Sequence, residues 1–312
     1  MSGGSRFEAY KRRRVVVRVH GKTHALPDLP IMSPSVSVVI PIFNGLHHLD
    51  ECLDSVIAQT HTDLEIVLVD GGSTDGSREW MHGVKDPRVR VLEMPAGTTA
   101  AGNWTASCRA ATGDFVKLLC QDDLLHPQAI EHQVADLLGN EQALMAVAQR
   151  DVIDARGSVL FHRWGCTGLA AGLVDGRSAL LAAYLNGTNV FGEPVAILFR
   201  RDALDSALPW NDDRPFLLDL ELYSRILAKG PIVVRREAVG AFRVSDSSWS
   251  TRLVATQSAQ MRAWQEEVEA QLLPTRGPRL KARTSLHSRK LLRRVAYRAL
   301  KTRGSFASAG QR

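Results

Sequence analysis

The stretch that decides the fold covers residues 36–70 and reads VSVVIPIFNGLHHLDECLDSVIAQTHTDLEIVLVD. Its two ends, residues 36–42 and 64–70, are apolar runs rich in β-branched side chains, which is typical of strands buried on both faces. Between them, apolar residues recur at helical spacing over residues 46–57, after an Asn44 that we expect to cap the helix. This order predicts two parallel strands joined by a crossing helix.

The same alternation continues along the chain. Further strands are predicted at residues 88–94, 114–119 and 143–153, with a helical pattern over residues 98–112. We therefore expect an α/β fold with a Rossmann-like, mostly parallel sheet and helices on both faces. In such a sheet, ligands bind beyond the carboxyl ends of the strands.

Composition limits the class of protein further. The chain has 312 residues and 45% hydrophobic content, enough for a substantial core. No apolar run reaches the roughly 18 residues of a membrane span, and the N-terminus lacks the apolar region of a secretory signal. The four cysteines match no zinc or CxxC spacing, so we expect reduced thiols in a cytoplasmic protein.

The charge of the chain is unevenly distributed. Residues 1–24 carry seven basic residues and one acid, and residues 275–312 carry twelve basic residues and no acid. Because the whole chain has a net charge of +6, residues 25–274 carry a net charge of −12. An acidic body argues against a nucleic-acid-binding protein, and basic ends predict an anionic partner, most simply a membrane surface.

The C-terminal basic segment contains a further pattern. Residues 288–301, SRKLLRRVAYRALK, place apolar side chains on one helical face and arginine and lysine on the other. This pattern is typical of a helix lying in a membrane interface. A helix packed on the acidic body or on a protein partner remains the alternative.

Polar residues follow successive predicted strands. Asn44 comes after the first strand, Asp70 ends the second, and the adjacent pair Asp122–Asp123 follows the strand at 114–119. Any one of them could simply end a strand or cap a helix, but three at successive strand ends favour a ligand site. A dinucleotide-dependent oxidoreductase is disfavoured, because the segment PIFNGLHHL after the first strand lacks a GxGxxG turn.

Two segments resemble a known family. Residues 36–77 resemble the opening of a family 2 glycosyltransferase with the GT-A fold, and GNWTASCRAATGDFVKLLCQDDLLHP (102–127) resembles the next family segment, which ends in a metal-binding acidic motif. The resemblance is strong over residues 36–138 and weaker over residues 139–250. It implies a nucleotide-sugar-binding half (34–140) and an acceptor-binding half (141–250). The charge distribution adds a basic N-terminal segment (1–33) and a basic, helical C-terminal extension (251–312).

The resemblance implies an inverting transfer from a nucleoside diphosphate sugar, with a UDP-sugar favoured. The acceptor would be a glycan or a lipid-linked molecule in cell-surface polysaccharide synthesis. Together with the cysteines and the basic ends, this predicts a cytoplasmic protein, peripheral at the inner face of the plasma membrane. Charge that develops on the leaving diphosphate calls for Mg²⁺ or Mn²⁺. By family position Asp123 is the metal ligand and Asp122 faces the donor ribose or sugar. Gln121 stands where many relatives have another acid.

We expect five further residues to contact the donor nucleotide: Pro41, Phe43, Asn44, Asp70 and Asn103. Phe43 can lie against the base, and Asp70 can accept a hydrogen bond from the imide N–H of uracil or thymine. Gly71 stands where the family often has a second acid, which leaves the identity of the base open. Arg109 and Lys117 are either diphosphate partners or solvated.

The base of an inverting transfer is expected in residues 215–230, PFLLDLELYSRILAKG. This helical pattern resembles the family segment that carries the catalytic carboxylate, and the match places the base at Asp219, with Glu221 as the rival. Gly192 and Glu193 resemble residues near the acceptor sugar. The alternative is a catalytically inactive, nucleotide-binding scaffold of a glycan-assembly complex, since two auxiliary acids of the family are missing.

Overall fold

The computed structural model describes residues 16–19, 22–25, 34–245 and 256–272 and divides the chain into two units, Met1–Pro34 and Ser35–Arg312. In the first unit, β1 (Val16–Val19) and β2 (Lys22–Ala25) pair antiparallel. The predicted helix at 288–301 lies outside the described residues. No helix in the part of the chain that the structure describes is long and apolar enough to cross a membrane.

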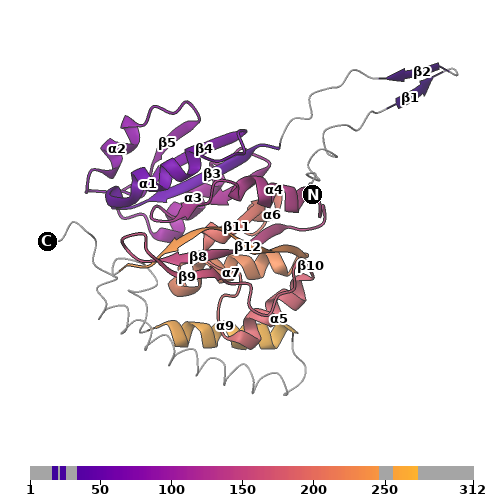
Figure 1. Ribbon diagram of the computed structural model, residues 1–312. Helices are drawn as coiled ribbons and strands as arrows, with labels where there is room; N and C mark the ends of the chain where they lie inside the picture. Colours follow the sequence, from indigo (N-terminus) through magenta and orange to yellow (C-terminus); the bar gives the residue numbers. More distant parts are fainter. Residues whose placement is uncertain (1–15, 20–21, 26–33, 246–255, 273–312) are drawn as a thin grey trace. The chain divides into compact units, whose positions relative to one another are not determined.

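The second unit is built on one mixed sheet (Figure 1). Its strands are β3 (Val36–Ile42), β4 (Leu64–Asp70), β5 (Val89–Glu93), β6 (Phe115–Leu118), β7 (Leu124–Leu125), β8 (Met145–Ile153), β9 (Val159–Trp164), β10 (Gly172–Val174), β11 (Ile197–Arg200) and β12 (Ile232–Arg243). The sheet order is β10-β12-β8-β11-β6-β3-β4-β5, with β7 paired to β12 and β9 paired to β8.

The parallel half of this sheet contains β5, β4, β3 and β6. Next to it, β11 runs antiparallel to both β6 and β8, and β12 is parallel to β8. All five strands predicted from the apolar runs are confirmed. The carboxyl ends of β3 and β4 lie together, with Ile42 opposite Asp70, so the loops that follow these strands meet at one edge.

Helices cover both faces of the sheet, as predicted. They are α1 (Leu46–Ile57), α2 (Ser77–Gly83) and α4 (Ala129–Leu138) on one face, and α3 (Ala100–Arg109), α5 (Gly176–Asn186), α6 (Arg201–Asp205), α7 (Leu218–Leu227) and α9 (Gln257–Leu272) on the other, with 3₁₀ turns η2 (Pro194–Ala196) and η3 (Pro215–Leu217). Alternate residues of β3 enter separate cores, Val38 and Ile40 toward α1 and Val39 toward α3. This two-sided burial explains why the strand is apolar throughout.

Helix α9 is part of the folded body, although it lies in the segment expected as a C-terminal extension. Its Trp264 Nε1 donates a hydrogen bond to Ser224 Oγ (3.1 Å) on α7, and Gln265 Nε2 donates to the carbonyl of Tyr184 (2.8 Å) on α5. Figure 1 shows α9 beside α5, away from β3–β5. The folded body therefore extends at least to the end of α9.

Candidate active site

The acidic pair lies in the loop between β6 and β7. Asp123 is fully buried, and its Oδ1 accepts a hydrogen bond from the backbone N–H of Arg243 (3.0 Å). Its Oδ2 is buried and has no hydrogen-bond partner among the described residues. Burial raises the pKa of both Asp122 and Asp123, and the charge of Asp122 raises that of Asp123 further. A bound cation would stabilise both carboxylates in their charged form.

Arg243, the last residue of β12, binds this loop through its backbone and its side chain. The side chain is 1% exposed; its Nε donates to the carbonyl of Asp122 (2.9 Å), and a terminal nitrogen pairs with Glu51 (2.7 Å) on α1. The acidic loop is therefore held by a strand and a helix that are distant in sequence. The sequence prediction missed this role, although an arginine at the end of the apolar run GAF was a usable signal.

Gln121 joins the acidic loop to the loop after β3. The N–H of Phe43 donates to Gln121 Oε1 (2.8 Å), and Gln121 Nε2 donates to the carbonyl of Phe43 (3.1 Å). A carboxylate at this position could make only the first of these bonds, which accounts for the glutamine. The side chain of Phe43 is 54% exposed beside the acidic loop, whereas Pro41 is buried within β3.

Asn44 holds two loops together and does not cap α1. Gly45 is the N-cap residue, and the N–H of Leu46 donates to Asp75 Oδ2 (3.1 Å). Asn44 has a positive φ of 50°, and its Oδ1 accepts a hydrogen bond from the N–H of Thr74 (2.8 Å). The expected cap was therefore wrong, because the following glycine starts the helix and an aspartate from the next loop binds its free N–H.

Asp70 is buried and is bound by the loop that follows it and by the first turn of α2. Its Oδ2 accepts two hydrogen bonds from Arg78 (3.0 and 2.8 Å), and its Oδ1 accepts one from the N–H of Ser73 (3.0 Å). Burial raises the pKa of Asp70, but the hydrogen bonds from Ser73 and Arg78 outweigh it and hold the pKa below its usual value. Arg78 and the backbone therefore already hold most of the acceptor capacity of this carboxylate.

Asn103 lies behind the ends of β3 and β4. It is 4% exposed, and its Nδ2 donates to the carbonyls of Ile42 (3.2 Å) and Val69 (3.4 Å). A Cβ at Gly71 would lie 2.8 Å from the same nitrogen, so the glycine leaves room for Asn103. The absent second acid of the family is thus linked to the packing of this amide.

Lys117 and Arg109, the two possible diphosphate partners, differ in their burial. Lys117 is fully buried, and its Nζ donates to Gln133 Oε1 (2.8 Å) and to the carbonyl of Val195 (2.5 Å). Burial lowers the pKa of this amine. Lys117 is therefore neither solvated nor available to a diphosphate, whereas Arg109 at the end of α3 is exposed.

Asp219 lies in the first turn of α7 and is partly buried. Its Oδ2 accepts a hydrogen bond from Asn189 Nδ2 (2.8 Å). Burial, and next to it the charge of Glu193, raises the pKa of Asp219 to about 7, which is suitable for a general base near neutral pH. The rival Glu221 pairs with Arg214 (3.2 Å). The structure thus places Asp219, and not Glu221, beside Glu193.

Glu193 lies within electrostatic reach of both the acidic loop and Asp219: its charge raises the pKa of Asp123 as well as that of Asp219. Buried polar atoms without a hydrogen-bond partner among the described residues include Asp123 Oδ2, Glu193 Oε2, Arg150 Nε and the Tyr223 hydroxyl. Such atoms indicate a polar ligand. The described residues contain no cluster of three or more metal-binding side chains, so a metal would rely on one or two carboxylates and ligand oxygens.

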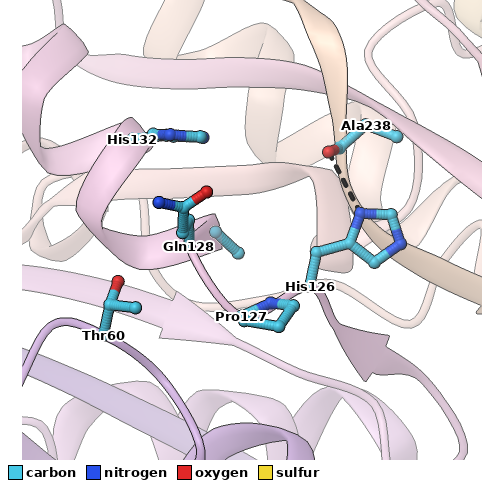
Figure 2. Close-up of a pocket in the computed structure, with 7 residues that line it drawn as sticks. Thr60, His126, Pro127, Gln128, His132 and Ala238 are labelled. Carbon is cyan, nitrogen blue, oxygen red and sulfur yellow. Dashed lines mark hydrogen bonds between the residues drawn. The ribbon is translucent and has the colours of Figure 1, made fainter.

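A separate hollow of about 410 Å³ lies at the start of α4 (Figure 2). It is lined by Thr60, His126, Pro127, Gln128, Ala129, His132 and Ala238. His126 forms a hydrogen bond with the carbonyl of Ala238 (3.2 Å). None of the predicted donor residues and no carboxylate is among the residues that line this hollow.

These features define an α/β protein with a polar site at the carboxyl edge of its sheet. The chain belongs to glycosyl transferase family 2, whose model matches residues 37–208, more than half of the chain. The chondroitin synthase of Pasteurella multocida is 30% identical over 129 residues, which cover 41% of this chain and 13% of that protein. The chain spans a third or less of the length of the first curated relatives that it matches.

Solved structures share the fold. TarS from S. aureus in complex with UDP-GlcNAc matches with a TM-score of 0.59 and 16% identity over 77% of this chain and 71% of that one. The mannosyltransferase PcManGT from Pyrobaculum calidifontis, in complex with GDP-Man and Mn²⁺, matches with a TM-score of 0.55 and 18% identity over 86% and 81%. These matches confirm the predicted GT-A fold class.

Proposed function

We propose that this chain is an inverting glycosyltransferase that moves a sugar from a nucleoside diphosphate sugar, with a UDP-sugar favoured, to a hydroxyl of a glycan or lipid-linked acceptor. Family membership supports glycosyl transfer, and the similarity to a chondroitin synthase supports polysaccharide synthesis. The observation that carries the proposal is the buried Oδ2 of Asp123, a carboxylate oxygen without a described partner beside a second carboxylate.

The acidic pair fits a divalent cation. Asp123 would bind Mg²⁺ or Mn²⁺, and Asp122 would face the donor ribose or sugar. When bound, the cation would supply Lewis-acid stabilisation to the leaving diphosphate. Arg243 holds the loop in shape, and Gln121 holds the backbone of Phe43, whose exposed ring is free to lie against a base. Pro41, Asn44, Asp70 and Asn103 shape the loops under the nucleotide.

Asp219 is the proposed base. Asn189 orients its carboxylate through Oδ2, and its raised pKa lets it accept the proton of an acceptor hydroxyl near pH 7. The proton leaves the hydroxyl as its oxygen attacks the anomeric carbon from the face opposite the diphosphate. The donor half (34–140) therefore supplies the acidic pair, and the acceptor half (141–250) supplies the base.

Nucleotide binding tests the metal assignment. Isothermal titration of UDP into the protein with Mn²⁺ should show tight binding that disappears in Asp123→Ala, because the variant lacks the main protein ligand. Glu141→Ala, which removes an exposed acid in the loop after α4, serves as the control and should bind UDP like the wild type. Unchanged Mn²⁺-dependent affinity in Asp123→Ala would refute the assignment.

Two observations favour the alternative of a catalytically inactive scaffold: Arg78 already binds the carboxylate of Asp70, and Gly71 stands where the family often has a second acid. A scaffold would bind a nucleotide without turning over a donor sugar. For the location of the protein, we propose the cytoplasm, with peripheral contact at the inner face of the plasma membrane through the basic ends of the chain.

A further inference from the structure

Arg150, in β8, is a buried arginine close to the proposed base. Its side chain is 5% exposed, and it forms an ion pair with Oε2 of Glu193. Its NH1 also donates a hydrogen bond to the carbonyl of Trp164 (3.1 Å), the last residue of β9. Burying a guanidinium costs free energy unless it is paired, so the contact with Glu193 is needed to keep Arg150 buried.

Two glycines make room for this guanidinium. Gly165 has a φ of 111°, and a Cβ there would lie 2.5 Å from Arg150 NH1. Gly192 has a φ of 101°, and a Cβ there would lie 3.1 Å from Arg150 Cζ. Both conformations are unfavourable for residues with a side chain. Two loops from different parts of the chain therefore leave a slot that fits the guanidinium and fixes its position.

Glu193, the ion-pair partner of Arg150, is linked to Asp219 through Asn189 and raises the pKa of Asp219. Asn189 Nδ2 donates to Asp219 Oδ2 (2.8 Å) and to the carbonyl of Gly192 (2.9 Å), which ties the base to the loop that carries Glu193. Oε2 of Glu193 forms the ion pair with Arg150, but it is buried and accepts no hydrogen bond from the described residues; the side chain as a whole is 28% exposed. Arg150 thus holds Glu193 by charge, and the carboxylate keeps the capacity to accept a hydrogen bond from a ligand.

We propose that Arg150 is a positioning residue for the acceptor side of this site: it fixes the Glu193 carboxylate beside Asp219, so that Glu193 and Asp219 together bind the attacking hydroxyl of the acceptor. The inference rests on the proposed function. Glu193 would accept a hydrogen bond from the acceptor and hold its oxygen in place, while Asp219 takes the proton. Arg150 acts only through Glu193 and touches no substrate.

The proposal predicts a measurable change in the pKa of Asp219, because charged groups surround this carboxyl. The titratable and charged groups that face Asp219 are Glu193 before η2, Arg150 on β8, Tyr223 on α7 and Cys120 after β6. Glu193 raises the pKa of Asp219, and Arg150 lowers it. Removing the charge of Glu193 should therefore lower this pKa, but only while Arg150 holds Glu193 close to Asp219.

The test is a cycle of variants read by ¹³C NMR of protein labelled at aspartate carboxyl carbons. The Asp219 signal is the one lost in Asp219→Asn, and its midpoint should lie near 7 in the wild type. Glu193→Gln should lower the midpoint by about one unit, the size of an effect from a nearby like charge. In an Arg150→Met background, the same change should shift the midpoint by less than half as much.

An equal shift in both backgrounds would overturn the inference, as would a midpoint that Glu193→Gln leaves unchanged. If Arg150→Met does not fold, Arg150→Lys takes its place, because its shorter side chain should also fail to hold Glu193 in position. The titration needs no donor turnover. Failure of the proposed function would instead appear as a wild type that hydrolyses no nucleotide sugar, so the two failures are distinguishable.

Discussion

Replacing Asp219 by asparagine should stabilise the protein at alkaline pH while it removes turnover. Burial and Glu193 raise the pKa of this carboxyl from 3.8 to about 7, so ionising it in the folded protein costs free energy. The unfolded chain ionises at the lower value. The cost is therefore absent below the unfolded pKa, grows as the pH rises between the two values, and is complete above the folded pKa.

The magnitude follows from the size of the shift. About three pKa units at roughly 1.4 kcal/mol each set an upper bound of about 4 kcal/mol. Because Asp219 is partly exposed, solvent screening reduces this cost, and we expect a gain of about 1–3 kcal/mol in the free energy of unfolding above pH 8. Asparagine keeps an oxygen that can accept the hydrogen bond from Asn189, so the local contact survives.

Thermal unfolding and turnover measure the two effects. At about 2 °C per kcal/mol for a chain of this size, the melting temperature of Asp219→Asn should exceed that of the wild type by roughly 2–6 °C at pH 8.5. The difference should nearly vanish at pH 4. Turnover should fall on the order of 10²–10⁴-fold, with donor affinity near the wild-type value. An equal stability difference at both pH values would refute the burial argument.

The same assay separates the two candidate bases. Glu221→Gln should retain turnover, because Glu221 pairs with Arg214 and not with the acceptor-side residues. If Glu221→Gln is the crippled variant and Asp219→Asn remains active, the base has been placed two residues too early.

Gly176→Ala should destabilise the protein by about 3 kcal/mol or more, since its Cβ would lie 2.1 Å from the carbonyl oxygen of Leu227 and 2.3 Å from that of Gly230. Gly83→Ala is the matched control, because no atom outside its own stretch of helix lies within 4 Å of the added Cβ; equal melting temperatures for the two variants would contradict the packing at α5. The full chain should co-sediment with anionic vesicles at low salt, and a chain ending at Pro274 should not, because it lacks residues 288–301, whose sequence predicts a basic amphipathic helix. Equal sedimentation of both chains, or binding that ignores salt, would remove the membrane interpretation.

The parallel half of the fold was predictable because its strands are buried on both faces. Strands such as β3 and β4 are continuous apolar runs bounded by polar loops, and both were predicted at their observed residues. By contrast, β12 was missed, because charged residues at 235–237 interrupt its apolar pattern and are partly or largely exposed at a register shift against β8. An interrupted pattern of this kind does not distinguish a strand from two short segments.

The candidate site was predictable where one strand end carries the chemistry. Asp122 and Asp123 stand out as an acidic pair after an apolar run, whereas Asp219 was assigned only by its resemblance to a family segment; the structure buries Asp123 and partly buries Asp219 in the first turn of α7. Arg150 and Arg243 were not assigned roles, because each is a single basic residue in a strand and its partners are distant in sequence. The burial of Lys117 could have been predicted, because a lysine inside the apolar run FVKLL must be buried with a hydrogen-bond partner.

Release of nucleoside diphosphate from a panel of nucleotide sugars tests the central claim most directly. We predict that the wild type hydrolyses at least one UDP-sugar in the presence of Mn²⁺, and that EDTA, Asp123→Ala and Asp219→Asn each reduce the rate at least about 100-fold. A wild type that binds UDP and releases none from any donor would contradict the account and identify the chain as a scaffold.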